Sequence, residues 1–133
     1  MIVVDTNVLA YVLLPGPKTQ LAEALLLHQP CWAAPPLWRS EWCNVLSTYL
    51  RRDLLVLPEA MALMQRAEAL LAGQEQPVTS HQVLRLAHSS RCSAYDCEFI
   101  AAAQQLGVPL VTEDRAVLAA FPEVARPLDS LVV

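Results

Sequence analysis

Four acidic residues stand at positions where their carboxylates need not face water. They are Asp5, Glu41, Asp96 and Asp114. Carboxylate oxygens are the ligands that Mg²⁺ and Mn²⁺ take in proteins, and Mg²⁺ keeps several waters when it binds. A cation held by such a set lowers the pKa of a bound water. The chemistry that these residues could do together is therefore metal-assisted hydrolysis of a phosphodiester.

Two of the acids follow predicted strands. Residues 2–4 are an uninterrupted β-branched run, which predicts a strand buried on both faces, and Asp5 comes directly after it. Residues 109–112 predict another strand, and Asp114 comes two residues after its end. Open α/β sheets bind ligands at this carboxyl edge. Each aspartate could instead only cap the helix that follows it, since Asp is a favoured N-cap.

The other two acids lie on predicted helices. Glu41 falls at the border of an apolar helix face, and Asp96 falls inside the buried face of a helix at 94–106, whereas Glu98 and Glu113 are expected to face solvent. A buried ionised carboxylate is costly unless it is paired or binds a metal. The alternatives are an ordinary edge carboxylate for Glu41 and a first-turn acid favoured by the helix dipole for Asp96. One shared site explains all four positions together.

The elements that must position these acids alternate along the chain. Strands are predicted at 2–4, 31–34, 109–112 and 130–133, with a weak candidate at 77–79. Helices are predicted after Asp5, at 21–27, from Pro36 to about 52, at 58–72, at 80–90 with Ser80 as its cap, at 94–106 between Ser93 and Gly107, and at 115–121. This order predicts a single α/β domain over 1–133, with a parallel sheet and helices on both faces.

Composition narrows the class of protein. Hydrophobic residues make up 55% of the chain and the mean hydropathy is +0.36, so part of the surface is expected to be covered by another subunit or partner. No apolar run is long enough to span a membrane and no signal peptide is seen, so we expect a cytoplasmic protein. The four cysteines lack zinc-site spacing and are interpreted as small buried residues.

The formal net charge of −4 argues against a simple electrostatic nucleic-acid binder. Four carboxylates at one site would account for that charge by themselves. Divalent cations would cancel it locally, so an acidic chain can still hold a phosphate backbone through bound metal.

These residues together resemble the PIN domain, and within it the VapC-type toxins, the ribonuclease halves of bacterial and archaeal toxin–antitoxin pairs. The resemblance covers nearly the whole chain. It rests on Asp5-Thr6-Asn7 after the first strand, Glu41 in the third helix, Tyr95-Asp96 at the start of a later helix, and Thr112-x-Asp114 after a strand.

The resemblance implies a three-layer α/β/α PIN-like fold around a central, mostly parallel sheet of four to five strands. It implies a metal-dependent endoribonuclease that uses Mg²⁺, with Mn²⁺ able to substitute, and that forms a homodimer and pairs with an antitoxin protein. Asp5, Glu41, Asp96 and Asp114 would be the catalytic, metal-binding acids, oriented by Thr6, Asn7 and Thr112. Basic residues are scarce, and Arg115 and Arg39 are our candidates for RNA phosphate contacts.

Two other enzyme classes fit the sequence less well, because residues that their sites need are missing. A phosphoacceptor receiver domain needs a lysine after a late strand, and a haloacid-dehalogenase-type phosphatase also needs a lysine, but the only lysine is Lys18, in an early loop. The phosphatase also needs a second aspartate where this chain has Asn7. A PIN-like module that binds nucleic acid or protein without cleaving anything stays open as the alternative function.

Overall fold

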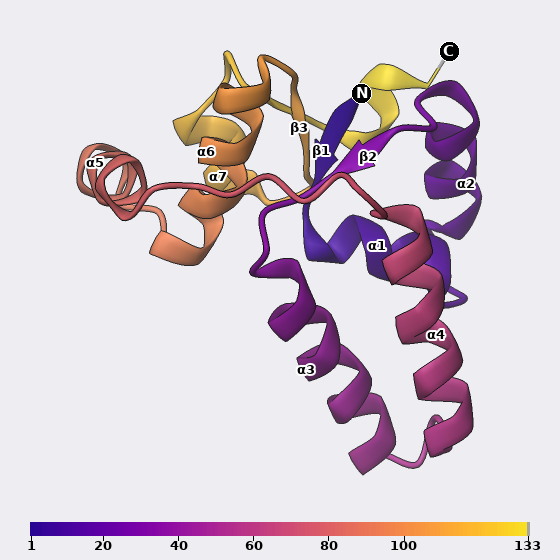
Figure 1. The fold of residues 1–133 in the computed structure, drawn as a ribbon. Coiled ribbons are helices and arrows are strands. Elements are labelled where there is room, and N and C mark those ends of the chain that lie inside the picture. The colour runs from indigo at the N-terminus through magenta and orange to yellow at the C-terminus, as the bar shows by residue number, and fades with distance from the viewer. Residues whose placement is uncertain (133) are drawn as a thin grey trace.

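A four-stranded parallel sheet forms the centre of the molecule (Figure 1). The computed structural model describes residues 1–132. The strands are β1 (Ile2–Val4), β2 (Trp32–Ala33), β3 (Leu110–Val111) and β4 (Ala125–Arg126), in the spatial order β2-β1-β3-β4. β1 is central and buried throughout, as its β-branched run predicts. The prediction of a parallel α/β sheet is confirmed.

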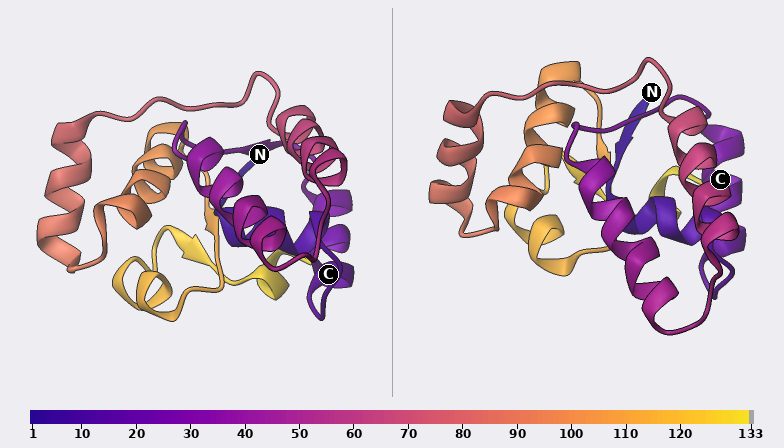
Figure 2. Two further views of the ribbon diagram at one scale, coloured as in Figure 1. Left: turned by 90° about the horizontal axis from the view of Figure 1, so that it is seen from below. Right: turned by 60° about the horizontal axis from the view of Figure 1, so that its bottom comes forward.

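Helices cover both faces of this sheet (Figures 1 and 2). α6 packs against β1 and β3, while α1 and α2 lie on the other side, so the three-layer prediction is also confirmed. The described residues contain seven α-helices and one short 3-10 helix: α1 (Thr6–Leu13), α2 (Thr19–His28), α3 (Trp38–Arg51), α4 (Leu57–Leu70), α5 (Ser80–Ser90), α6 (Ala94–Leu106), α7 (Arg115–Ala120) and η1 (Leu128–Leu131).

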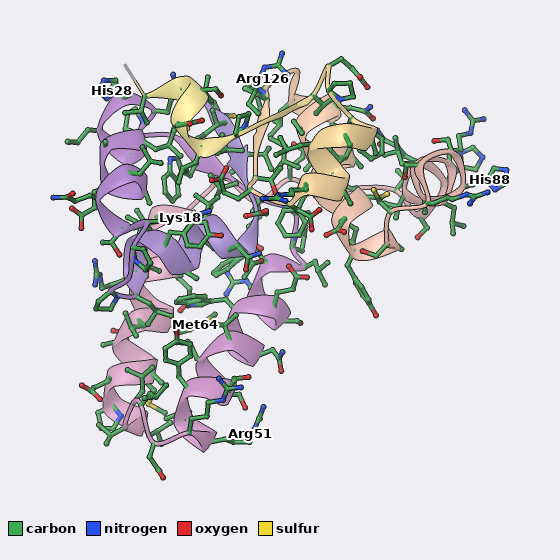
Figure 3. All side chains as sticks on the ribbon, turned by 180° about the vertical axis from the view of Figure 1, so that it is seen from behind. Lys18, His28, Arg51, Met64, His88 and Arg126 are labelled. Carbon is green, nitrogen blue, oxygen red and sulfur yellow. The ribbon has the colours of Figure 1, made fainter. Side chains whose placement is uncertain are left out.

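Two helical extensions flank the sheet. α3 and α4 pack together as an arm that projects from the body, with Arg51 near its far end (Figures 1 and 3). α5 packs against α6 on the opposite side of the molecule. The arm is joined to the core by fully buried indoles, since Trp38 and Trp42 lie one turn apart on α3 and are both 0% exposed. This packing fixes the first turns of α3 next to the sheet.

The predicted termini of α6 are confirmed in detail. The Ser93 hydroxyl accepts a hydrogen bond from the Asp96 amide at 3.0 Å, and Gly107 ends the helix in the left-handed region with φ 67°. A glycine adopts that conformation without the steric cost that a side chain would bring. The cap places Asp96 in the first turn of α6, at the carboxyl edge of the sheet.

Two strand predictions are wrong. No strand forms at 77–79, where Thr79 instead caps α5 by accepting from the Gln82 amide, so that α5 begins at Ser80 and Ser80 is not its cap. The last strand is β4, not 130–133: residues 128–131 form η1, and Val133 lies outside the described residues. Pro127 separates β4 from η1, and having no N–H it cannot extend the pairing of β4 with β3.

Among the described residues, none of the helices is both long and apolar enough to cross a membrane.

Candidate active site

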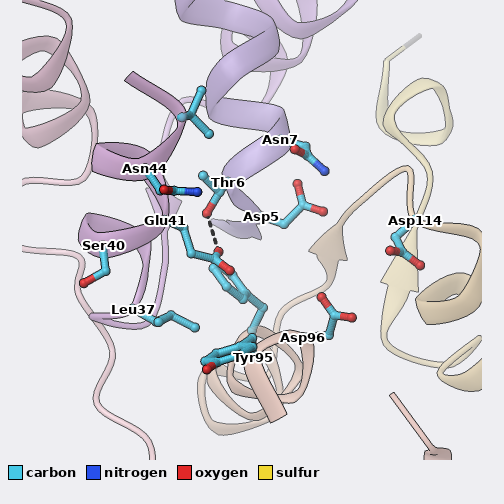
Figure 4. A pocket seen from close by; sticks show the side chains of 12 residues that line it. Asp5, Thr6, Asn7, Leu37, Ser40, Glu41, Asn44, Tyr95, Asp96 and Asp114 are labelled. Carbon is cyan, nitrogen blue, oxygen red and sulfur yellow. Dashed lines mark hydrogen bonds between the residues drawn. The ribbon is translucent and has the colours of Figure 1, made fainter. Parts of the chain in front are cut away.

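One cavity at the carboxyl edge of the sheet is lined by all four predicted acids (Figure 4). Its volume is about 530 Å³. Asp5 comes from the junction of β1 and α1, Glu41 from the first turn of α3, Asp96 from the first turn of α6, and Asp114 from the segment before α7. The structure thus brings together residues that are up to 109 positions apart, from 5 to 114.

Asp5 has two hydrogen-bonding roles. Its Oδ1 accepts from the Val8 amide at 3.0 Å and caps α1, while its Oδ2 accepts from the Thr112 hydroxyl at 2.5 Å. The capping explanation that the sequence left open is therefore correct, and it leaves the carboxylate at the cavity wall. Capping and a place in the cavity hold at the same time.

Thr112 connects the two aspartates that follow strands. Its hydroxyl donates to Asp5 and accepts from the Asp114 amide at 3.0 Å, and the residue is only 1% exposed. Asp114 Oδ1 in turn accepts from the Val117 amide at 3.0 Å and caps α7. Thr112 thus contacts both acids, and an orienting role for it in catalysis stays a prediction.

On the other side of the cavity, the Thr6 hydroxyl donates to Glu41 Oε1 at 2.7 Å (Figure 4). Thr6 is 7% exposed, so this bond is sheltered and ties the first turn of α1 to α3. Asn7 also lines the cavity but is exposed to solvent. The three polar residues predicted to accompany the acids therefore all lie at this edge.

Burial raises the pKa values of two of the cavity acids, Asp5 and Asp96. The pKa of Asp5 rises from 3.8 to about 6, mainly because the group is buried, and the charges of Asp96 and Glu41 add to the rise, while the bonds from Thr112 and Val8 oppose it. Burial also raises the pKa of Asp96, offset by the Ser93 hydroxyl and reinforced by Asp114. Among the described residues that line the cavity there is no Lys, Arg or His. No cationic side chain among these described lining residues offsets the charge of the acids.

The donor set fits a hard divalent cation in its chemistry, because four carboxylates face a cavity whose described lining residues include no cationic side chain. Within residues 1–132, however, no three Asp, Glu, His or Cys side chains lie close enough together to hold a metal ion as they stand. Direct contact from several acids would require side-chain rotation. Waters retained by the ion could fill the remaining distance, as they commonly do for Mg²⁺.

Two acids outside the predicted site, Glu98 and Glu113, are less exposed to solvent than the sequence predicted. Glu98 is half-buried rather than turned to solvent, and burial together with the nearby charge of Glu41 raises its pKa. Glu113 is also half-buried, and it binds Lys18 Nζ at 3.1 Å and the Leu128 amide at 3.0 Å. The partners of Glu113 come from distant segments, so no local sequence pattern predicts these contacts.

The two arginines predicted to contact RNA differ in their surroundings. Arg39 forms ion pairs with Glu68 and Glu75, both at 2.9 Å, and lies over the Trp38 ring. Arg115 is exposed at the first position of α7, beside Asp114, and its side chain makes no hydrogen bond or ion pair with the described part of the chain. A role in RNA binding stays a prediction for both.

The fold is shared with solved structures. PAE2754 from Pyrobaculum aerophilum superposes with a TM-score of 0.77 at 20% identity, over 98% of this chain and 85% of that one. FitAcB from Neisseria gonorrhoeae gives 0.74 at 20% identity, over 94% and 96% of the two chains, and FitAB bound to an IR36 DNA fragment gives 0.75 at 20%, over 96% and 95%. At this identity the likeness concerns the fold.

None of the curated proteins matches the sequence significantly. A family model does: the model of the PIN domain matches residues 2–126, which include all four cavity acids and the whole sheet. The chain therefore belongs to the PIN domain family.

Proposed function

We propose that this protein is a metal-dependent endoribonuclease that hydrolyses phosphodiester bonds at the cavity lined by Asp5, Glu41, Asp96 and Asp114. The observation that carries the proposal is that these four carboxylates line one cavity without a cationic side chain among its lining residues. Such a cavity attracts divalent cations, and a bound cation can in turn attract the phosphate of a nucleic acid.

The four acids would hold Mg²⁺, or Mn²⁺ in its place. When bound, the ion would lower the pKa of the attacking water and offset negative charge on the phosphate. The protein's own part is positioning. Thr112 holds the carboxylate of Asp5 and the backbone of Asp114, and Thr6 holds Glu41. Asn7 and Ser40 line the same cavity and can donate hydrogen bonds to an RNA strand.

We further propose that the protein acts in the cytoplasm as the toxin of a toxin–antitoxin pair and that it forms a homodimer. The support is the VapC-like order of its motifs and a set of exposed apolar side chains where α3 meets α4. Each of these side chains is more than half exposed: Leu54, Val56, Leu57 and Met61. A protein partner would remove this apolar surface from water.

The test of nuclease activity uses a pool of unstructured single-stranded RNAs and three proteins: wild type, Asp96→Asn, and Asp129→Asn as a matched control. Asp129 is exposed on η1 and does not line the cavity. We expect cleavage by wild type and Asp129→Asn in Mn²⁺ or Mg²⁺, none in EDTA, and none by Asp96→Asn.

Two results would contradict the proposal. Cleavage by Asp96→Asn at the wild-type rate in saturating Mn²⁺ would show that the cavity acids do not carry the reaction. Binding of RNA by wild type without cleavage in either metal would favour the non-catalytic PIN-like module instead.

A further inference from the structure

The segment that carries Asp114 has no regular secondary structure. Residues 112–114 connect β3 to α7. Thr112 bonds to Asp5, and Asp114 lines the cavity and caps α7. The position of Asp114 therefore depends on what holds this short connection, and Glu113 stands in its middle.

Glu113 uses both carboxylate oxygens to fasten the segment to two other parts of the fold. Oε1 accepts from Lys18 Nζ at 3.1 Å, and Oε2 accepts from the Leu128 amide at 3.0 Å. Lys18 precedes α2, and Leu128 begins η1, which packs against α2. We call these three residues the Glu113 clamp. It joins the segment next to Asp114 to the α2 side of the molecule.

Lys18 is itself held in place, because its ammonium lies over the Tyr11 ring, 5.2 Å from the centroid. Figure 3 shows Lys18 on the α1–α2 side of the molecule. Its side chain is 43% exposed and that of Glu113 is 24% exposed, so the pair is partly open to solvent. Ion pairs this exposed contribute little to global stability. An effect of the pair should therefore be local.

We propose that Lys18 and Glu113 are positioning residues, which hold the backbone at Asp114 so that its carboxylate stays at the cavity. The proposal rests on the proposed function in one respect, namely that Asp114 binds the metal. Hydrogen-bonded groups behind metal ligands typically change metal affinity by about 10- to 100-fold when they are removed. Because the clamp acts through the backbone and not on the carboxylate itself, we expect the low end of that range.

Positioning and simple electrostatics predict opposite results for Lys18→Met. Removing a positive charge from the protein strengthens cation binding, if it has any effect, when only charge matters. Loss of the clamp weakens cation binding, because one anchor of the Asp114 segment is gone. Glu113→Gln cannot separate the two effects, since it removes both a negative charge and the ion pair. Lys18→Met is therefore the decisive variant.

The experiment has two readouts on the whole chain. The first is amide hydrogen exchange by NMR in the metal-free protein, read at Asp114, whose amide donates to Thr112, and at Val3 in the central strand, whose amide donates to Pro109, as the reference. The second is Mn²⁺ binding by titration calorimetry. The variants are Lys18→Met, Lys18→Arg and, as a control for loss of an unpaired surface cation, Arg52→Met.

We expect Lys18→Met to speed exchange at Asp114 but not at Val3, and to raise the Kd for Mn²⁺ about tenfold. Lys18→Arg should keep the exchange rate at Asp114 and the Kd for Mn²⁺ close to those of wild type, because it keeps the charge and the donors. Arg52→Met should leave both quantities unchanged. Unchanged exchange at Asp114 in Lys18→Met, or tighter Mn²⁺ binding, would overturn the clamp. If wild type binds no Mn²⁺ while exchange at Asp114 responds as expected, the clamp stands and the metal-dependent function falls.

Discussion

The hydroxyl of Thr112 donates a hydrogen bond to Asp5 Oδ2 at 2.5 Å, between residues 107 positions apart in the chain. The same hydroxyl accepts from the Asp114 amide. One buried side chain thus sets the spacing between the acids that follow β1 and β3, which are neighbouring strands of the sheet. A threonine does this better than a longer polar residue because its β-branched stem is stiff.

Replacing Thr112 with valine should uncouple these two acids. The shape is kept, but Asp5 loses a donor and the Asp114 amide loses its acceptor. An unsatisfied buried group costs about 1–3 kcal/mol, so urea unfolding should show a loss in that range. Mn²⁺ affinity should fall about tenfold by titration calorimetry. Thr112→Ser keeps the hydroxyl and serves as the control; a serine variant as weak as the valine variant would contradict the role of the hydroxyl.

Asp5→Asn should stabilise the metal-free protein near neutral pH. The pKa of Asp5 rises from 3.8 to about 6 on folding, so the folded state holds a proton more tightly than the unfolded chain. The stability that the wild type has at low pH is therefore lost as pH rises from about 4 to 6. Two pKa units correspond to about 3 kcal/mol, an upper limit because Asn only partly keeps the two hydrogen bonds of Asp5.

The measurement is Tm against pH for wild type and Asp5→Asn in EDTA. The advantage of the variant should be small at pH 4, widen up to pH 6 and level off above it. Saturating Mg²⁺ should narrow the gap at pH 7.5, because an ion that binds only the folded wild type stabilises it. A constant difference across this pH range would mean that Asp5 is not protonated in the way its burial implies.

The sequence predicted the parts of the fold that have local signals. The β-branched run at 2–4, the Ser93 cap and Gly107 each determine a local conformation, and the structure has all three. The strand Ala125–Arg126 was missed because its two residues carry no strand pattern. It forms through backbone pairing with β3, and nothing in the residues near it reveals that pairing.

The candidate site also has residues that local sequence signals predict and residues that they do not. The four acids could be located because each follows a strand or lies on a helix face, and their convergence follows from parallel topology. Glu113 was expected to face solvent, and the expectation failed because its partners, Lys18 and Leu128, are 95 and 15 positions away. The expectation for Glu98 also failed, because its burial and the nearby charge of Glu41 depend on where the fold places α6 and α3.

The Ser93 cap should contribute both to the stability of the fold and to the position of Asp96. In Ser93→Ala the Asp96 amide loses its acceptor at the start of α6, which costs about 1 kcal/mol for a typical N-cap. Urea unfolding should show this loss, and Mn²⁺ affinity should fall because the first turn that carries Asp96 frays. Ser93→Asp supplies a new capping oxygen and should restore stability. If Ser93→Ala unfolds like the wild type, the cap does not hold this turn in solution.

Arg115 and Arg39 should contribute unequally to RNA binding. The Arg39 guanidinium is held by Glu68 and Glu75, so a phosphate would have to displace two carboxylates to reach it. Arg115 is exposed beside Asp114 and is not held in this way.

Binding of a short single-stranded RNA, measured in an Asp96→Asn background to prevent cleavage, should weaken in Arg115→Met across sequences. The slope of log K against log salt should fall in magnitude by about 0.7, the value for one phosphate contact on a single strand. Arg39→Met should leave both the affinity and the slope unchanged. Equal losses in the two variants would show that RNA recruits Arg39 out of its ion pairs, and that the strand contacts both α3 and α7.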